Sequence, residues 1–338
     1  MSQLKLGVVG TGFIADVMAT AIRESGVATI TAVASRRRER ADAFAQGHDV
    51  ERAFDHWSEL MGWDGIDAVY VATPTVARED VCLASARAGK HLLAEKPFAN
   101  LHSLCAITAA CRATGVAFID ATHFVHHPRH TKLRAQLVER VGQPQSIHTK
   151  FFFPCTDRAN IRLDPQQEPT GAIGDMAWYS MRAVAEFTPD DAALDSASGF
   201  LQRDPVTHAV IRGAGVLRLS DGCTSTWEAG YNTGASVMDL SIQGSRGMIW
   251  MDDFVLDWQR GFEGGDPSRA PTFSQRSGVS GPANFESVTV ASEVRQSALL
   301  VRAFASLVAD PHQSANERSM QMSERTQALI DGIWSTLR

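Results

Sequence analysis

The fold is decided by the stretch Leu4-Lys5-Leu6-Gly7-Val8-Val9-Gly10-Thr11-Gly12-Phe13-Ile14-Ala15. Its apolar first half predicts a buried strand, and its second half fits the GxGxxG/A pattern that joins a strand to a helix in dinucleotide-binding proteins. The first glycine allows a tight turn, and the second lets the backbone approach a pyrophosphate. The following helix would offer unpaired N–H groups to the phosphates. We therefore expect the dinucleotide to contact Gly10, Thr11, Gly12, Phe13 and Ile14.

Strand-like and helix-like segments alternate through the first third of the chain. Short apolar runs rich in β-branched residues predict strands at 4–9, 29–34, 68–72, 91–94 and 117–119. Segments rich in Ala, Arg and Glu favour helices between them, at 37–46, 77–88 and 101–114. This alternation predicts an α/β domain of the Rossmann type with a doubly wound parallel sheet.

The residues after the second predicted strand indicate which dinucleotide binds. NAD-preferring sites usually carry Asp or Glu at this strand end, where the carboxylate accepts hydrogen bonds from the ribose hydroxyls. Here Ser35 and Arg36 follow the strand, and the first carboxylate comes only at Glu39. A serine hydroxyl and an arginine fork suit a 2′-phosphate. We expect NADP(H) to be preferred over NAD(H), with Ser35, Arg36 and Arg40 around the phosphate.

Two further strand ends carry candidate ligand-binding residues. Thr73-Pro74 follows the strand at 68–72 and could cover the nicotinamide ribose, although an ordinary proline turn explains it equally well. Glu95-Lys96-Pro97 follows the strand at 91–94. Ligands of open α/β sheets bind outside the carboxyl ends of the strands. We therefore expect Thr73, Pro74, Glu95 and Lys96 at the cofactor site, with Lys96 beside the dinucleotide.

The pattern changes after about residue 143. Segments 145–153, 209–219, 223–231, 236–244 and 248–252 look like strands joined by short turns, which is typical of antiparallel pairing. The Gly/Pro/Ser-rich segment 260–282 predicts a long loop, and helical periodicity returns at 292–308 and 317–337. We expect a Rossmann domain over residues 1–122 and an α+β domain with a large, mainly antiparallel sheet over residues 123–338. The C-terminal helix could pack back on the first domain.

A second polar group lies in Gly171-Ala172-Ile173-Gly174-Asp175-Met176-Ala177-Trp178-Tyr179. Asp175 is predicted to N-cap a helix, and Tyr179, four residues later, could share its side. A carboxylate and a phenol on one face could bind sugar hydroxyls and relay a proton. Alternatively, the helix is simply capped, and Trp178 and Tyr179 belong to the core. Arg162 precedes this segment and either binds substrate or forms a surface salt bridge.

Four histidines lie close together, at positions 123, 126, 127 and 130. Their spacing would suit one helix face, but Pro128 interrupts a regular helix and no Cys or Glu completes a ligand set. We therefore expect no metal. One or two of these histidines, His123 first, are expected to line a substrate pocket instead.

The composition excludes several classes of partner. A net charge of −6 gives no overall positive field to hold nucleic acid or an anionic membrane. No apolar run reaches the roughly 18 residues of a membrane-spanning helix. The five cysteines are scattered without a CxxC pair, and the chain enters its first strand at Leu4, which leaves no room for a secretory signal. We expect a cytoplasmic protein with reduced thiols.

Taken together, the glycine turn, Glu95-Lys96-Pro97, the Gly174-Asp175 helix start and the late turn at 243–247 resemble the glucose-fructose oxidoreductase/inositol dehydrogenase/MocA (Gfo/Idh/MocA) family over nearly the full chain. The resemblance implies a Rossmann domain, an open-faced C-terminal sheet that builds homodimers or homotetramers, and hydride transfer between a nicotinamide and a sugar, polyol or related carbonyl. It also matches Lys96 and Asp175 to the family's active-site lysine and aspartate. Tyr179 stands where many members have His, as in relatives similar to xylose and dihydrodiol dehydrogenases, and Arg78 likewise replaces a common His.

These features lead to a specific functional hypothesis. Lys96 would hydrogen-bond the reacting oxygen, and Tyr179 would give or take the proton. Asp175, Arg162 and His123, with Trp178 nearby, would orient the rest of the substrate. Two alternatives stay open: a reductase of a nucleotide-linked keto-sugar, and a sensor that binds a dinucleotide without catalysis. The sequence leaves the substrate and the direction of the reaction undecided.

Overall fold

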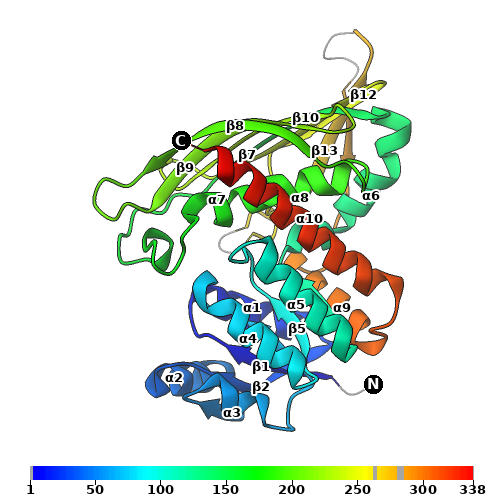
Figure 1. The fold of residues 1–338 in the computed structure, drawn as a ribbon. Coiled ribbons are helices and arrows are strands. Elements are labelled where there is room, and N and C mark those ends of the chain that lie inside the picture. The colour runs from blue at the N-terminus through cyan, green and yellow to red at the C-terminus, as the bar shows by residue number, and fades with distance from the viewer. Residues whose placement is uncertain (1–2, 262–264, 280–284, 338) are drawn as a thin grey trace. The chain divides into compact units, whose positions relative to one another are not determined.

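The computed structural model describes residues 3–261, 265–279 and 285–337, which belong to two compact units (Figure 1). Unit 1 is built from Met1–His123 and Val294–Glu324, and unit 2 from Phe124–Glu293 and Arg325–Arg338. The sequence predicts a single division after residue 122. In the structure, by contrast, residues 294–324 belong to the same unit as the N-terminal segment.

Unit 1 is a parallel sheet with helices between its strands (Figure 1). In chain order its elements are β1 (Leu4–Val9), α1 (Phe13–Ser25), β2 (Ala28–Ala34), α2 (Arg38–His48), β3 (Arg52–Phe54), α3 (Trp57–Met61), β4 (Ala68–Val71), α4 (Thr75–Arg87), β5 (His91–Ala94), α5 (Leu101–Thr114), β6 (Phe118–Asp120), α9 (Gln296–Ala309) and the part of α10 (Ser314–Thr336) that ends at Glu324. The short edge strand β3 is absent from the sequence-based prediction.

The strand order of unit 1 is β3-β2-β1-β4-β5-β6, which confirms the predicted doubly wound sheet. The chain starts in the middle and winds outward in both directions, so the order reverses beside β1. The strand ends are in register. Val9 pairs with Val71, and Val71 pairs in turn with Ala94. The segments after β1, β4 and β5 therefore leave the sheet along one edge, where ligands of such sheets bind.

The C-terminal segment completes the core of unit 1. Leu300, Val301, Phe304 and Leu307 of α9 are at most 6 % exposed and belong to the same apolar cluster as residues of α1, α2 and β1. Arg295, just before α9, donates to Glu24 on α1 at 2.7 Å. Because α9 buries apolar side chains of α1, this segment is part of the nucleotide-binding fold.

Unit 2 contains an eight-stranded sheet with helices along one face (Figure 1). Its elements are η1 (His123–His126, which begins at the last residue of unit 1), α6 (Pro128–Gln136), η2 (Leu137–Val141), β7 (Pro144–Phe152), η3 (Ile161–Leu163), α7 (Gly171–Asp175), α8 (Ala177–Phe187), β8 (Leu194–Arg203), β9 (Val210–Leu219), β10 (Thr224–Gly230), β11 (Val237–Gly244), β12 (Gly247–Met251), β13 (Thr272–Ser277), β14 (Glu286–Thr289) and the end of α10.

The sheet of unit 2 has the order β14-β13-β12-β11-β7-β10-β9-β8 and is mainly antiparallel, as predicted. The exception is the pair β7 and β10, which run parallel. The prediction of one long loop over residues 260–282 is wrong for residues 272–277, which form β13. Residues 262–264 and 280–282 of that range lie outside the described residues. β13 was missed because its sequence, Thr-Phe-Ser-Gln-Arg-Ser, places one large apolar side chain among polar ones.

Candidate active site

The glycine turn of unit 1 has the geometry that a bound pyrophosphate requires. Gly10 adopts a φ of 110°, and a Cβ at this position would lie 2.5 Å from the carbonyl oxygen of Ala72, so only glycine fits. A Cβ at Gly12, by contrast, would point into open space with no described atom within 4 Å. A larger side chain would fill this space beside the first turn of α1. The turn therefore fits a dinucleotide phosphate group held by helix N–H groups.

The end of β2 lies beside the glycine turn. The Thr11 hydroxyl donates to Ser35 Oγ at 3.3 Å, which joins two of the predicted cofactor residues. Arg36 and Arg40 are exposed, and neither forms an ion pair within the described part of the chain. Arg38, by comparison, pairs with Asp42 at 2.9 Å. Two cations beside Ser35 thus keep their guanidinium groups available for an anion.

The ends of β4 and β5 place the remaining predicted cofactor residues on the same edge. Thr73 precedes Pro74, the N-cap residue of α4, and its Oγ1 is buried without a hydrogen-bond partner among the described residues. Such a group is expected to bind a ligand or a water molecule. Glu95 is 7 % exposed, and its Oε1 accepts from the Tyr70 hydroxyl at 2.7 Å. This contact fixes Glu95, the residue before Lys96. Lys96 itself is half-buried.

In unit 2, Asp175 is the centre of a polar cluster. Its Oδ2 accepts from Arg162 Nε at 2.7 Å and from the Tyr231 hydroxyl at 3.0 Å. Burial and the neighbouring Asp175 carboxylate raise the pKa of Tyr231 well above its usual range, so the phenol keeps its proton. The same carboxylate raises the pKa of Arg162. Asp175 and Arg162 were predicted from the sequence, whereas Tyr231 was not.

The local structure around Asp175 differs from the prediction. Asp175 is the last residue of α7, and the residue that precedes α8 is Met176, so the predicted N-cap role of Asp175 is wrong. Helix α7 begins at Gly171, which has a φ of 47° and where a Cβ would lie 2.3 Å from the carbonyl oxygen of Val210, so Asp175 falls at the end of this helix. Tyr179 is in the separate helix α8, 6 % exposed, with its ring edge-on to Phe151 at 5.2 Å. Trp178 is fully buried.

Three of the four neighbouring histidines have separate polar partners. His123 ends unit 1, where its Nδ1 accepts from the Gln296 amide at 2.8 Å. His127 N-caps α6 by accepting from the backbone N–H of Arg129, and Pro128 begins that helix instead of breaking one. His130 contacts Glu186 at 3.3 Å. Among the described residues, no three metal-binding side chains gather to form a metal site.

The predicted site residues thus fall into two groups, each described within its own unit. Unit 1 holds Gly10, Thr11, Gly12, Phe13, Ile14, Ser35, Arg36, Arg40, Thr73, Pro74, Glu95, Lys96 and His123. Unit 2 holds Arg162, Asp175, Trp178 and Tyr179. In the part of the chain that the structure covers, no helix is long and apolar enough to cross a membrane.

Comparison with known proteins matches both units to one family. Residues 4–121 match the model of the oxidoreductase family with an NAD-binding Rossmann fold, GFO_IDH_MocA, and residues 132–250 match the GFO/IDH/MocA C-terminal domain. The chain is 30 % identical to a dTDP-3,4-didehydro-2,6-dideoxy-alpha-D-glucose 3-reductase from Actinomadura kijaniata, over 74 % of this chain and 75 % of the relative. It is 29 % identical to a D-xylose 1-dehydrogenase (NADP(+)) from Haloferax volcanii, over 68 % and 69 % of the two chains.

Solved structures show the same similarity. A 3-ketoreductase from Actinomadura kijaniata, in complex with NADP and TDP-benzene, superposes with a TM-score of 0.87 at 26 % identity, over 100 % of this chain and 98 % of that one. Other structures of that ketoreductase carry a tyrosine-to-phenylalanine or a lysine-to-alanine substitution.

Proposed function

As a member of the Gfo/Idh/MocA oxidoreductase family, the chain is an NAD(P)-dependent dehydrogenase or reductase of sugars, polyols or related compounds, and we propose that it prefers NADP(H) and uses Lys96 and Tyr179 in catalysis. One observation carries the proposal. The glycine turn, Thr73 and Lys96 follow the aligned ends of β1, β4 and β5, so the lysine leaves the sheet on the edge that holds the dinucleotide turn.

The proposed roles follow from side-chain chemistry. Bound NADP(H) supplies or accepts the hydride. Lys96 donates a hydrogen bond to the reacting oxygen, which stabilises the negative charge that develops there during carbonyl reduction. Tyr179 gives its phenolic proton to that oxygen, or takes a proton back in the oxidation direction. The hydride and the proton from Tyr179 together would convert a carbonyl to an alcohol.

The other predicted residues act on the rest of the substrate. We assign to Asp175 and Arg162 the orientation of substrate hydroxyls, because their contact at 2.7 Å presents a carboxylate and a guanidinium together. His123 would orient a further hydroxyl, with its ring held by Gln296. Trp178 has no exposed surface, so we assign it to the core beneath α8 and not to direct contact with substrate.

The preference for NADP(H) is supported by charge at the end of β2. Ser35, with the unpaired cations Arg36 and Arg40, would bind the 2′-phosphate through charge-assisted hydrogen bonds. No carboxylate stands at the strand end to accept the ribose hydroxyls of NAD. The D-xylose dehydrogenase from Haloferax volcanii is named for NADP(+), and the ketoreductase from Actinomadura kijaniata was solved with NADP, which agrees with this assignment.

A second substrate class is favoured by the comparisons. The relative from Actinomadura kijaniata is named for a dTDP-linked keto-sugar, and its structure was solved with TDP-benzene. A nucleotide-linked keto-sugar is therefore the first alternative to a free sugar or polyol.

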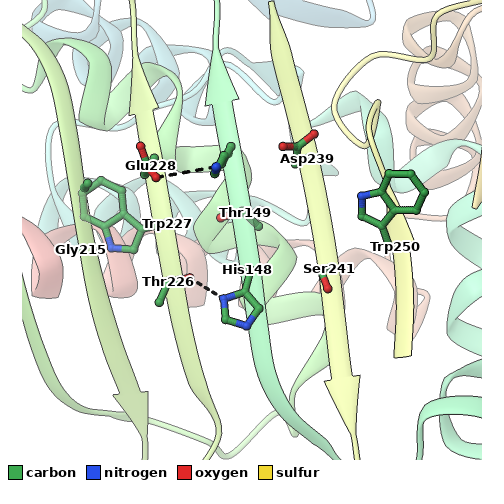
Figure 2. Close-up of a pocket in the computed structure, with 11 residues that line it drawn as sticks. His148, Thr149, Gly215, Thr226, Trp227, Glu228, Asp239, Ser241 and Trp250 are labelled. Carbon is green, nitrogen blue, oxygen red and sulfur yellow. Dashed lines mark hydrogen bonds and ion pairs between the residues drawn. The ribbon is translucent and has the colours of Figure 1, made fainter. Parts of the chain in front are cut away.

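We further propose a homodimer or homotetramer formed through the sheet of unit 2. The face turned away from α7 and α8 carries a row of residues in cross-strand register, including Val216, Thr226, His148, Ser241 and Trp250. Figure 2 shows this face, which has a hollow of about 370 Å³ between His148, Glu228 and Trp250. Phe200, Val216 and Trp250 are 53 %, 46 % and 45 % exposed there.

The composition of this face suits a second copy of the chain. Lys150 and Glu228 lie 4.0 Å apart and the His148 ring contacts the Thr226 hydroxyl at 2.6 Å, so these four polar side chains are already paired within the sheet (Figure 2). A paired polar surface with large apolar side chains is typical of a protein interface.

The free cysteines of the described chain agree with the proposed cytoplasmic location.

The test is an activity panel with free aldoses, ketoses, polyols, diketones and TDP-linked keto-sugars, each with NADP(H) and NAD(H). We expect turnover of at least one sugar, and Lys96→Ala should lower kcat about 10²–10⁴-fold while NADPH binding persists. Lys132→Ala, at an exposed lysine of α6, is the matched control and should remain active. NADPH binding without turnover of any compound would contradict the proposed substrate classes, and a fully active Lys96→Ala would remove this lysine from the mechanism.

A further inference from the structure

Arg78 is a buried arginine of unit 1 that forms no ion pair with any described residue. It is 4 % exposed and stands in the first turn of α4, directly after the strand end that carries Thr73. Arginine is almost never this buried unless its charge is compensated. In the described chain, no carboxylate forms an ion pair with Arg78. Its compensation comes from uncharged oxygen atoms instead.

These oxygen atoms belong to the two loops that flank the proposed cofactor site. Nη2 of Arg78 donates to the carbonyl of Thr73 at 2.5 Å, and Nη1 donates to the carbonyl of Pro97. Nη1 also contacts Thr75 Oγ1 at 3.3 Å. The two carbonyls lie beyond the last ladder bonds of the strands, in which Ala72 N–H donates to Val9 and Glu95 N–H donates to Val71. The guanidinium therefore continues the cross-linking of β4 and β5 after the backbone pairing has ended.

The position of the second carbonyl connects Arg78 to Lys96. Pro97 directly follows Lys96 in the sequence. The hydrogen bond from Arg78 to the Pro97 carbonyl therefore holds the backbone one residue after the lysine. On the other side of Lys96, Glu95 is held by the Tyr70 hydroxyl at 2.7 Å. The backbone that carries the lysine is thus anchored before and after it. These two anchors bracket Lys96 in the chain.

The shape of the guanidinium explains why arginine occupies this position. Its two terminal nitrogens diverge from one plane and can reach carbonyls from two different loops, which a single ammonium group cannot reproduce. The residue carries a cost, because its Nε is buried with no hydrogen-bond partner among the described residues. An arginine that only filled space would be replaceable by an apolar side chain without that cost.

We propose that Arg78 is a positioning residue for catalysis, which fixes the Lys96-Pro97 loop against the Thr73-Pro74 loop so that the lysine amine meets the reacting oxygen. The proposal rests on the assigned role of Lys96. It gives Arg78 no contact with substrate or cofactor. Its effect is exerted through the two carbonyls alone.

The decisive variant is Arg78→Lys, which keeps the charge but loses the fork. Arg87→Lys, at the exposed end of the same helix, is the matched control. We expect Arg78→Lys to lower kcat about 10–100-fold, since small misplacements of a catalytic group cost this much, while the Kd for NADPH changes less than about 2-fold. Arg87→Lys should match the wild type in both quantities. A purely structural role would lower the melting temperature and the active fraction but would leave kcat per folded molecule unchanged.

A readout that needs no substrate separates this inference from the proposed function. The chain has five lysines, at positions 5, 90, 96, 132 and 150, so ¹³C-methylated lysine NMR can resolve Lys96, assigned by its loss in Lys96→Arg. In Arg78→Gln, which keeps the number of lysines at five, the Lys96 resonance should shift or broaden, and in the matched control Arg87→Gln it should not. If wild-type protein turns over no sugar, the proposed function fails while this signal still tests Arg78. An unmoved Lys96 resonance together with normal kcat overturns the inference. Should Arg78→Lys not fold, Arg78→Gln, with one amide donor and no charge, is measured in the same way.

Discussion

Asp175 and Tyr231 are joined by a hydrogen bond of 3.0 Å although they lie 56 positions apart in the chain. The phenol donates to Oδ2, the same oxygen that Arg162 contacts at 2.7 Å. Because burial and the carboxylate keep the Tyr231 pKa high, the direction of this hydrogen bond is fixed over the working pH range. Asp175 is therefore held as an acceptor by two donors of different kinds.

Replacing Tyr231 by Phe removes one of these donors without changing the ring. We expect kcat/KM for the best sugar to fall about 10-fold, because the loss of one hydrogen bond to a charged group corresponds to roughly 1.5 kcal/mol. Steady-state kinetics with the thermal midpoint as a folding check provide the measurement. Tyr179→Phe, which removes the proposed proton donor, should cause a larger loss that is confined to kcat. Unchanged kcat/KM in Tyr231→Phe would separate this phenol from the function of Asp175.

Arg36→Ala tests the cofactor preference. Without the guanidinium fork, kcat/KM for NADP(H) should fall about 10–100-fold, while the value for NAD(H) should stay within about 2-fold, because only NADP carries the 2′-phosphate. Arg38→Ala is the control, since that arginine is paired with Asp42. Equal losses with both dinucleotides would show that Arg36 does not recognise the phosphate.

The buried His127 predicts a dependence of stability on pH. Burial, with Arg129 and His130 nearby, lowers the pKa of His127 to about 3. Between the ordinary value of 6.5 and about 3, the unfolded chain binds a proton at this position and the folded chain does not. Stability therefore falls as the pH falls through this range, by up to about 1.4 kcal/mol per pH unit for this one group.

His127→Asn replaces the Nδ1 acceptor that caps α6 by an amide oxygen, which is favoured at an N-cap, and removes the titrating group. Urea unfolding between pH 6.5 and 5, above the range in which most carboxylates titrate, should give a shallower loss of stability for the variant than for the wild type. Parallel curves for the two proteins would mean that His127 is protonated in the folded state.

Trp250→Glu tests the proposed oligomer. A carboxylate in the exposed face of the sheet, near Asp239, would have to be desolvated on association and should shift the protein to a smaller species at micromolar concentration. Light scattering coupled to size exclusion gives the mass directly. Val206→Glu places the same charge at an exposed apolar residue in the turn between β8 and β9 and should leave the mass unchanged. A variant Trp250→Glu with the wild-type mass would direct the search for the interface elsewhere.

Features that are local in the sequence were predicted well. The glycine turn and Glu95-Lys96-Pro97 are continuous segments, and each sits at the end of an apolar strand whose pairing follows from the α/β alternation. β8 was missed because its residues, Leu-Asp-Ser-Ala-Ser-Gly-Phe-Leu-Gln-Arg, show no regular alternation of apolar and polar side chains. Its position at the edge of the sheet tolerates such a sequence.

Features that depend on contacts between distant segments could not be predicted. Tyr231 ends the run of a predicted strand, and nothing in that run indicates that the chain returns to Asp175. The role of Arg78 was equally hidden, because its partners are backbone carbonyls, which every residue carries. Asp175 was misplaced as an N-cap because the backbone conformation of Gly171, and hence the start of α7, depends on close packing against Val210.

The return of residues 294–324 to unit 1 has a consequence for biosynthesis. Until the ribosome has made α9, the apolar side of α1 lacks the cover of Leu300, Phe304 and Leu307. The nucleotide-binding unit therefore cannot finish folding at the moment when its sheet has left the ribosome. N-terminal domains generally fold first during synthesis, but this unit must wait for residues 294–324. An apolar surface on α1 therefore stays uncovered for most of translation, and uncovered surfaces of this kind are the ones that chaperones protect from aggregation.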